Sequence, residues 1–172
     1  VRQMSLFGAG WTVGSLKYLS EGRASRVTYY ETSGWRGVME TEAGPPLTGT
    51  FRSVPGAVFP LYHVLADTNE FAGGNTVPCR SSDPLRVDGM VLESGNRLRV
   101  LATNLSPHDQ TMHVSYPALG DRVTIKMLDA GSAELAMTDP AAFRSAAPEQ
   151  VSCPGGVLTL DLPPYAVARV DR

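Results

Sequence analysis

Two spacings of hydrophobic residues divide this chain near residues 73–74. Before that point, apolar side chains recur every three or four positions in two stretches, as they do on one face of an α-helix. The first stretch is Leu6–Ser20, with one stripe formed by Phe7, Trp11, Gly14 and Tyr18. Glu21 and Gly22 follow as a stop signal. We therefore predict a helix over Leu6–Ser20.

A second helix is predicted over Ala57–Ala66. Pro60 has no N–H for an intrahelical bond, so it is tolerated only in the first turn. The hydrogen-bonded helix should therefore begin within a residue or two of Phe59. The apolar residues of this stretch sit at i, i+3, i+4 and i+7: Val58, Leu61, Tyr62 and Leu65.

Between these helices, the β-forming run Arg26–Glu31 predicts a strand that ends on a carboxylate. A segment rich in Gly and Pro, Gly34–Pro55, follows without a clear period. Loops longer than about 12–15 residues in a compact domain are usually functional or disordered. A strand that only filled a core would not need to end on Glu31 and lead into such a loop, which favours a role in binding.

After Thr76 apolar residues recur at every second position, which is typical of strands with one buried face. Apolar and polar residues alternate along four runs, and a further strand is expected at residues 165–171. Turn signals such as Ser94-Gly95-Asn96 separate them. Short strands in this rhythm predict an antiparallel β-sandwich. The four runs are Leu98–Ala102, Met112–Tyr116, Val123–Met127 and Leu158–Leu162.

Helix, strand, long loop and helix, in that order, are typical of a (β/α) unit. One unit cannot bury both faces of its own strand, because parallel strands need neighbours and helices on both sides. We therefore expect an α+β, mainly β chain in two parts. Residues 1–73 would be the last strand and helix unit of a (β/α)8 (TIM) barrel, and residues 74–172 a β-sandwich. Val1 in place of an initiator Met indicates a piece of a longer protein.

Composition narrows the function classes. The chain has 172 residues, 42% of them hydrophobic, as expected of a globular protein. Its 15 Lys and Arg against 17 Asp and Glu give a formal charge of −2, which argues against a nucleic-acid partner. No apolar run approaches the ~20 residues of a membrane helix. Cys79 and Cys153 form no metal or redox motif, so we expect free thiols in a reducing cytoplasm.

The strand that ends at Glu31 indicates a binding site. In a (β/α)8 barrel, catalytic side chains come from the C-terminal ends of the strands and the loops after them. That face should collect a carboxylate, an aromatic plane, a guanidinium and an amide, which together suit a small sugar-derived substrate. The expected catalytic residue is Glu31, and the expected substrate-binding residues are Gln3, Tyr30, Trp35, Arg36 and Glu40.

Structural roles remain open for several of these residues. Glu31 could be a strand-end carboxylate paired with Arg26 or Arg36, and Trp35 could cap the barrel. His63, beside the apolar stripe of the second helix, is expected to be a hydrogen-bonded packing residue. The chain has no HExxH, no GxSxG and no Gly-rich phosphate loop, so neither a metal nor a cofactor is predicted. The oligomeric state stays open.

Beyond these patterns, the chain resembles the D-apionate lactonase family in four segments: QMSLFGAGWTVGSLKYLSEG, VTYYETSGWRGVMETEAG, PGAVFPLYHVLADTNEFAGG and RSSDPLRVDGMVL. The resemblance covers residues 3–92 well and the rest loosely. It implies a barrel like those of glycoside hydrolases, between an N-terminal and a C-terminal β domain. It also implies hydrolysis of D-apionolactone to D-apionate in the breakdown of the sugar apiose. It carries no catalytic residue across.

Lactone hydrolysis needs a water molecule activated against a carbonyl group and a stabilised oxyanion. Glu31 could act as the general base, and Arg36 or Gln3 could stabilise the negative charge. Because a whole barrel needs ~250 residues, this chain alone is expected to be inactive.

Two other functions stay open. A retaining glycoside hydrolase would need two carboxyl groups ~5–5.5 Å apart, and this segment offers one well-placed carboxylate, Glu31. The sandwich could instead be a carbohydrate-binding or purely structural module. Its only Tyr or Trp residues, Tyr116 and Tyr165, favour the structural role.

Overall fold

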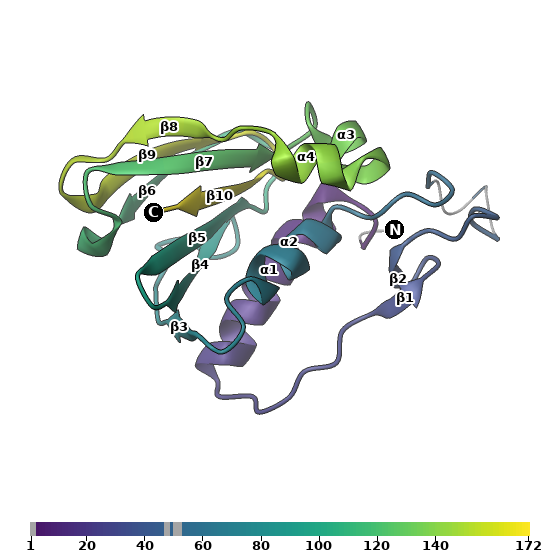
Figure 1. The fold of residues 1–172 in the computed structure, drawn as a ribbon, viewed down its shortest axis with the longest axis horizontal. Helices are drawn as coiled ribbons and strands as arrows, with labels where there is room; N and C mark the ends of the chain where they lie inside the picture. Colours follow the sequence, from purple (N-terminus) through teal and green to yellow (C-terminus); the bar gives the residue numbers. More distant parts are fainter. Residues whose placement is uncertain (1–2, 47–48, 50–52) are drawn as a thin grey trace.

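A computed structural model describes residues 3–46, 49 and 53–172 (Figure 1). Within them, none of the helices has the length and apolar character that a membrane span requires. The helices are α1 (Leu6–Glu21), α2 (Leu61–Asn69), α3 (Ala133–Thr138) and α4 (Pro140–Ser145), with 3-10 turns at Pro117–Leu119 and Pro154–Gly156. The strands are β1 (Glu31–Ser33), β2 (Gly37–Met39), β3 (Asn75–Val77), β4 (Val87–Ser94), β5 (Arg97–Asn104), β6 (Gln110–Ser115), β7 (Arg122–Leu128), β8 (Glu149–Ser152), β9 (Val157–Leu162) and β10 (Val167–Asp171).

The main sheet has six strands in the order β3-β4-β5-β10-β7-β8, and every neighbouring pair in it is antiparallel. Strand β10 lies inside the sheet, with Ala168 opposite Ala102 of β5 and Met127 of β7. Strands β6 and β9 form a separate antiparallel pair. The predicted antiparallel sandwich is therefore confirmed.

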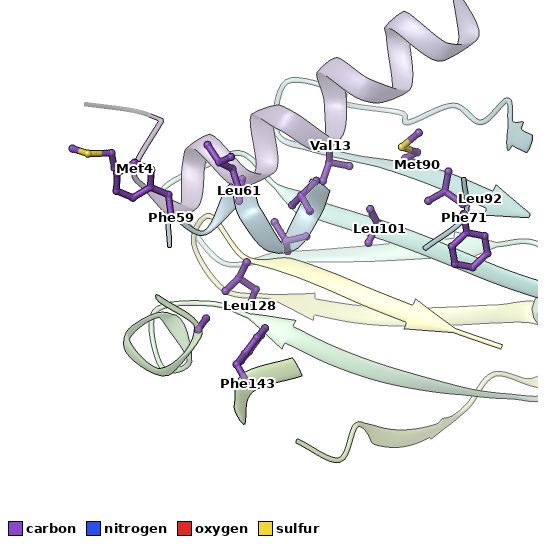
Figure 2. Close-up of a cluster of buried hydrophobic side chains, with 14 residues drawn as sticks. Met4, Val13, Phe59, Leu61, Phe71, Met90, Leu92, Leu101, Leu128 and Phe143 are labelled. Carbon is purple, nitrogen blue, oxygen red and sulfur yellow. The ribbon is translucent and has the colours of Figure 1, made fainter. Parts of the chain in front are cut away.

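The main sheet is covered on both faces, because successive side chains of a strand point to opposite sides. Along β5, Leu98, Val100 and Ala102 belong to one core together with side chains of β6 and β9. Leu101, between them, belongs to a second core that includes side chains of α1 and α2 (Figure 2). The sheet thus separates a strand pair on one side from helices on the other.

The second core joins the two parts of the chain (Figure 2). Side chains from before and after residues 73–74 are buried together in it, so the helices of the first part pack directly on the sheet. Its labelled members before that point are Met4, Val13, Phe59, Leu61 and Phe71, and those after it are Met90, Leu92, Leu101, Leu128 and Phe143.

Helix α1 lies on the main sheet through its small residues. Ser5 caps its N-terminus with the side-chain oxygen. A Cβ on Gly10 would come within 2.3 Å of Thr103 Oγ1, so only glycine allows this close approach.

The predicted helix Leu6–Ser20 is confirmed to within one residue at its end. Two aromatic residues of its stripe, Trp11 and Tyr18, nevertheless face outward, with 52% of their surface exposed.

Helix α2 begins at Leu61, after Pro60 at its N-cap. A start at this position agrees with the prediction that the hydrogen-bonded helix begins within a residue or two of Phe59. The predicted first residue, Ala57, however, lies before the helix. The reason is that the segment before Pro60 pairs with β2. The Phe59 N–H donates to the carbonyl of Val38 at 2.8 Å, which holds this segment extended beside the strand.

The predicted strand Arg26–Glu31 is wrong. Residues 26–30 form neither a helix nor a strand, and Glu31 begins β1 instead of ending a strand. A strand exists only where its N–H and C=O groups find partners on a neighbour. No described strand pairs with residues 26–30, so their β-forming composition does not decide their structure.

Two expectations about single side chains are confirmed. Cys79 and Cys153 are free thiols. His63 is a buried packing residue, 2% exposed, whose Nε2 lies 2.8 Å from the carbonyl oxygen of Ala136.

Candidate active site

The candidate site surrounds the short parallel pair of β1 and β2, which Figure 1 shows apart from the main sheet. The connection between these strands is a tight turn that needs glycine at two positions. Gly34 has φ +84°, and a Cβ on Gly37 would come within 2.7 Å of the backbone of Ser33. Glu31 pairs with Gly37 in the register, so it lies beside the residues of the turn that follows it.

Glu31 and Arg36 are exposed on this turn, and Trp35 between them is half-buried against the core. Arg36 Nη1 lies 3.8 Å from Glu31 Oε1, and the two side chains are 62% and 63% exposed. The guanidinium carbon of Arg36 lies 4.6 Å from the centroid of the Trp35 ring, which is a cation–π contact. Because both side chains are largely exposed, both charged groups are accessible to a ligand. An exposed ion pair also contributes little to stability, so a ligand can replace it at low cost.

Gln3 and Tyr30 connect this turn to α1. The Nε2 of Gln3 donates to the carbonyl of Gly37 at 2.8 Å. The Thr12 hydroxyl donates to the carbonyl of Gly8 at 2.7 Å, so it accepts the proton of the Tyr30 hydroxyl, 3.0 Å away. Burial raises the pKa of Tyr30, which keeps the phenol protonated as a donor. Tyr30 also has a left-handed φ of 46°, a strained conformation of the kind found at binding sites.

A cavity of about 410 Å³ opens beside Gln3 and Tyr30. Phe7, Gly8 and Trp11 of α1 also line it. Sequence reasoning did not include these residues in the site. The spacing of Phe7 and Trp11 did predict that both rings lie on one face of the helix. It did not show that this face borders a cavity.

Glu40, unlike Glu31 and Arg36, is buried. It is 1% exposed, and its carboxylate accepts hydrogen bonds from the Thr41 N–H at 2.8 Å and from the Ser53 hydroxyl. A buried carboxylate with both oxygens bonded holds the local chain in place. The structure thus leaves Glu40 out and brings Glu31, Trp35 and Arg36 into contact with one another. Gln3 is bonded to the backbone of the same strand pair, and the Tyr30 side chain is bonded to α1.

This arrangement combines groups suited to hydrolysis of a small polar molecule. The exposed carboxylate of Glu31 can take a proton from water, and the Arg36 guanidinium beside it can stabilise a developing negative charge. The half-buried ring of Trp35 supports the Arg36 guanidinium that lies over it. Across the described residues, no three His, Cys, Asp or Glu side chains lie close enough to hold a metal ion.

The fold is similar to that of several carbohydrate-active enzymes. The chain matches a glycoside hydrolase family 30 endoxylanase from Clostridium papyrosolvens C71 with a TM-score of 0.51 and 14% identity, over 66% of this chain and 28% of the other. It matches a family 30 subfamily 8 xylanase from Clostridium acetobutylicum with a TM-score of 0.53 and 14% identity, over 79% of this chain and 30% of the other. The chain therefore spans less than a third of either enzyme.

Family models assign the chain more closely. Residues 1–73 match the TIM barrel domain of D-apionate lactonase, and residues 84–170 match its C-terminal immunoglobulin-like domain. A comparison with curated proteins found no match. The two domain matches follow each other in the order expected from the resemblance noted in the sequence. The chain belongs to the D-apionate lactonase family.

Proposed function

We propose that this chain is the C-terminal part of an enzyme that hydrolyses D-apionolactone to D-apionate in apiose breakdown. Membership of the family supports the lactonase activity. The observation that carries the proposal within this chain is the exposed pair of Glu31 and Arg36, with the Arg36 guanidinium stacked on Trp35. Free Cys79 and Cys153 are in keeping with a reducing cytoplasm as the site of the reaction.

In the proposed reaction, Glu31 is the general base. Its carboxylate takes a proton from a water molecule while the water oxygen bonds to the lactone carbonyl carbon. The carbonyl oxygen becomes an oxyanion, which Arg36 stabilises, with the second amide N–H of Gln3 as a further donor. When the oxyanion collapses, the ring C–O bond breaks, and the ring oxygen takes the proton from Glu31 and leaves as a hydroxyl group. The product is a carboxylic acid, which releases its remaining proton to the solvent and becomes a carboxylate.

Further parts of the active site should come from other barrel strands. The matched barrel region has 73 residues, whereas a whole (β/α)8 barrel has about 250. In that fold, catalytic groups are supplied by several strand ends, so one segment holds few of them. We therefore expect no turnover of D-apionolactone by the 172-residue chain alone, and turnover when the rest of the barrel is present.

A retaining glycoside hydrolase is the second candidate, favoured by the similarity of the fold to xylanases. Such an enzyme needs a nucleophile and an acid/base carboxyl group about 5–5.5 Å apart. Glu31 could be one of them. Glu40 is unsuited to be the other, because it is buried and bonded to Thr41 and Ser53. The partner would have to lie elsewhere in the barrel.

For the sandwich itself, we propose a structural role. Its two Tyr residues are occupied: Tyr116 donates to Glu93 Oε1 at 2.6 Å, and the Tyr165 ring packs edge-on against Phe7 of α1 at 5.8 Å. Isothermal titration of the chain with oligosaccharides should give no heat. Measurable binding that persists in Glu31→Gln would favour a carbohydrate-binding module instead.

Substrate assays on the whole protein separate the two enzyme candidates. The lactonase proposal expects ring opening of D-apionolactone, followed as acid release, and no cleavage of aryl glycosides. Release of the aryl alcohol without lactone turnover would favour the glycoside hydrolase. A panel of other sugar lactones would then show whether the enzyme prefers the branched five-membered ring.

A further inference from the structure

A small cavity lies where α2 meets the main sheet. Its volume is about 10 Å³, close to what a single water molecule needs. Among the described residues, two buried side-chain nitrogen atoms lack a hydrogen-bond partner, His63 Nδ1 and Arg169 Nε, and both residues line this cavity. Buried polar atoms almost always have partners, so a cavity with two unpaired ones indicates a bound molecule.

The two atoms differ in what they need. His63 Nε2 lies 2.8 Å from the carbonyl oxygen of Ala136 and must donate to it, which leaves Nδ1 of the neutral ring as an acceptor. Arg169 Nε carries a proton. It lies 2.9 Å from Asp171 Oδ2, but its N–H is not directed at that oxygen. The cavity therefore presents one donor and one acceptor.

The other polar groups around the cavity are already occupied. Lys126 on β7 donates to the carbonyls of Phe143, Arg144 and Ala146. Arg144 on α4 and Arg169 on β10 contact Asp67 of α2 at 2.9 and 3.2 Å. An anion would leave His63 Nδ1 unsatisfied, and a cation would be repelled by Arg169. A water molecule, which both donates and accepts, satisfies both atoms.

We propose that this cavity binds one water molecule, which accepts the Arg169 Nε–H and donates to His63 Nδ1. This water bridge fastens α2, in the region that matches the barrel, to β10 of the sandwich. It exists only while the His63 ring is neutral, since a protonated ring would put a second donor in the cavity.

Protonation of His63 would also place a positive charge among cations. Arg144, Arg169 and Lys126 face it from α4, β10 and β7, and Asp67 on its own helix is the single carboxylate among the described residues that line the cavity. Burial lowers the pKa of His63 from 6.5, against the opposing bond to Ala136. The unfolded chain therefore binds more protons just below pH 6.5, so stability falls as the pH drops through that value.

Crystals of the full 172-residue chain at pH 7.5 test the occupant. We expect one water peak within about 2.7–3.2 Å of both His63 Nδ1 and Arg169 Nε. An empty cavity would overturn the proposal. A bromide soak at the same pH should leave the cavity without an anomalous peak, and a bromide peak there would show an anion site instead.

Urea unfolding between pH 7.5 and 5.5 tests the dependence on His63. The folding equilibrium constants of the wild type and of the control His113→Gln should fall by up to about tenfold per pH unit, the limit for one proton. In His63→Gln, the side-chain amide can still hydrogen-bond to Ala136 and to the water, but it does not titrate. The folding equilibrium constant of this variant should therefore fall less. Equal losses in all three proteins would contradict the proposal.

If His63→Gln does not fold, nitrogen NMR of the wild type decides. We expect a predominantly neutral His63 ring at pH 6.5, with its proton on Nε2. A ring that carries its proton on Nδ1, or that is mainly charged at this pH, would overturn the water bridge.

Discussion

Lys17 lies on the buried face of α1, where its ammonium group meets the carboxylate of Asp88 on β4 at 2.6 Å. Both side chains are 2% exposed. Asp88 also accepts the N–H of Gly89 at 2.8 Å. Burial alone would lower the pKa of Lys17, but the hydrogen bond and the charge of Asp88 raise it, so the pair stays ionised. At the scale of residues, this pair ties the first part of the chain to the sandwich.

Removing one member of the pair should cost more than removing both. Lys17→Met leaves Asp88 buried without its partner, and we expect a loss of about 3–5 kcal/mol in the free energy of unfolding. The double variant Lys17→Met/Asp88→Leu should recover much of that loss, because no buried charge remains. Urea unfolding measures both. A single variant within about 1 kcal/mol of the wild type, or a double variant less stable than either single one, would refute the role of this pair.

Single residues show what the sequence could and could not predict of the candidate site. Glu31, Trp35 and Arg36 were found because they are close in sequence, and a short turn brings them together. The burial of Glu40 was missed, since it depends on Ser53, beyond the next turn. The ion pair of Lys17 was missed for the same reason: its partner lies 71 positions away.

At the scale of elements, the approach of α1 to β5 rests on Gly10. A Cβ at this position would meet the fully buried Thr103, whose hydroxyl donates to the carbonyl of Ala166 and so has little freedom to move. Gly14, one turn further along, has no neighbour within 4 Å of such a Cβ. Gly10 and Gly14 lie in the same helix, but only Gly10 lies against the sheet, so Gly14 can serve as its control.

Gly10→Ala should destabilise the chain by about 1–3 kcal/mol, because the added methyl group forces the helix away from the sheet. Gly14→Ala should stabilise it by about 0.5–1 kcal/mol, since alanine is the better helix former. Thermal or urea unfolding measures both changes. Equal effects of the two substitutions would mean that α1 does not dock through Gly10.

Elements with a clean local pattern were predictable. Helix α1 follows from its spacing and its stop signal, and the strands with strict alternation were found near their true bounds. Strand β4 was missed because Asp88 and Gly89 interrupt its apolar run. Residues 26–30 show the opposite case: they have strand composition without a partner strand.

At the scale of the whole molecule, the two family-matched regions share one core and one network of charges. Arg99 of β5 is central to that network, with a side chain only 5% exposed. It contacts Glu70 beyond α2 at 2.7 Å, Asp67 of α2 at 3.7 Å and Asp171 of β10 at 2.5 Å. Because core and charges both cross residues 73–74, α1 and α2 should unfold together with the sheet.

Hydrogen exchange of the 172-residue chain tests this coupling. Amides of α1 should be protected as strongly as those of β5, since both are held by the same core. Amides of β1 should exchange much faster, because that strand is exposed along its length and lies outside the main sheet. Fast exchange throughout α1, with a protected β5, would show that the first part unfolds independently.

Hydrolysis of D-apionolactone by the whole protein tests the proposed general base most directly. Glu31→Gln keeps the size of the side chain but removes the base, so kcat should fall by about 10²–10⁴-fold. The matched control is Glu134→Gln, an exposed carboxylate on α3, which should leave kcat unchanged. A Glu31→Gln enzyme that opens the lactone at the wild-type rate would contradict the role proposed for Glu31.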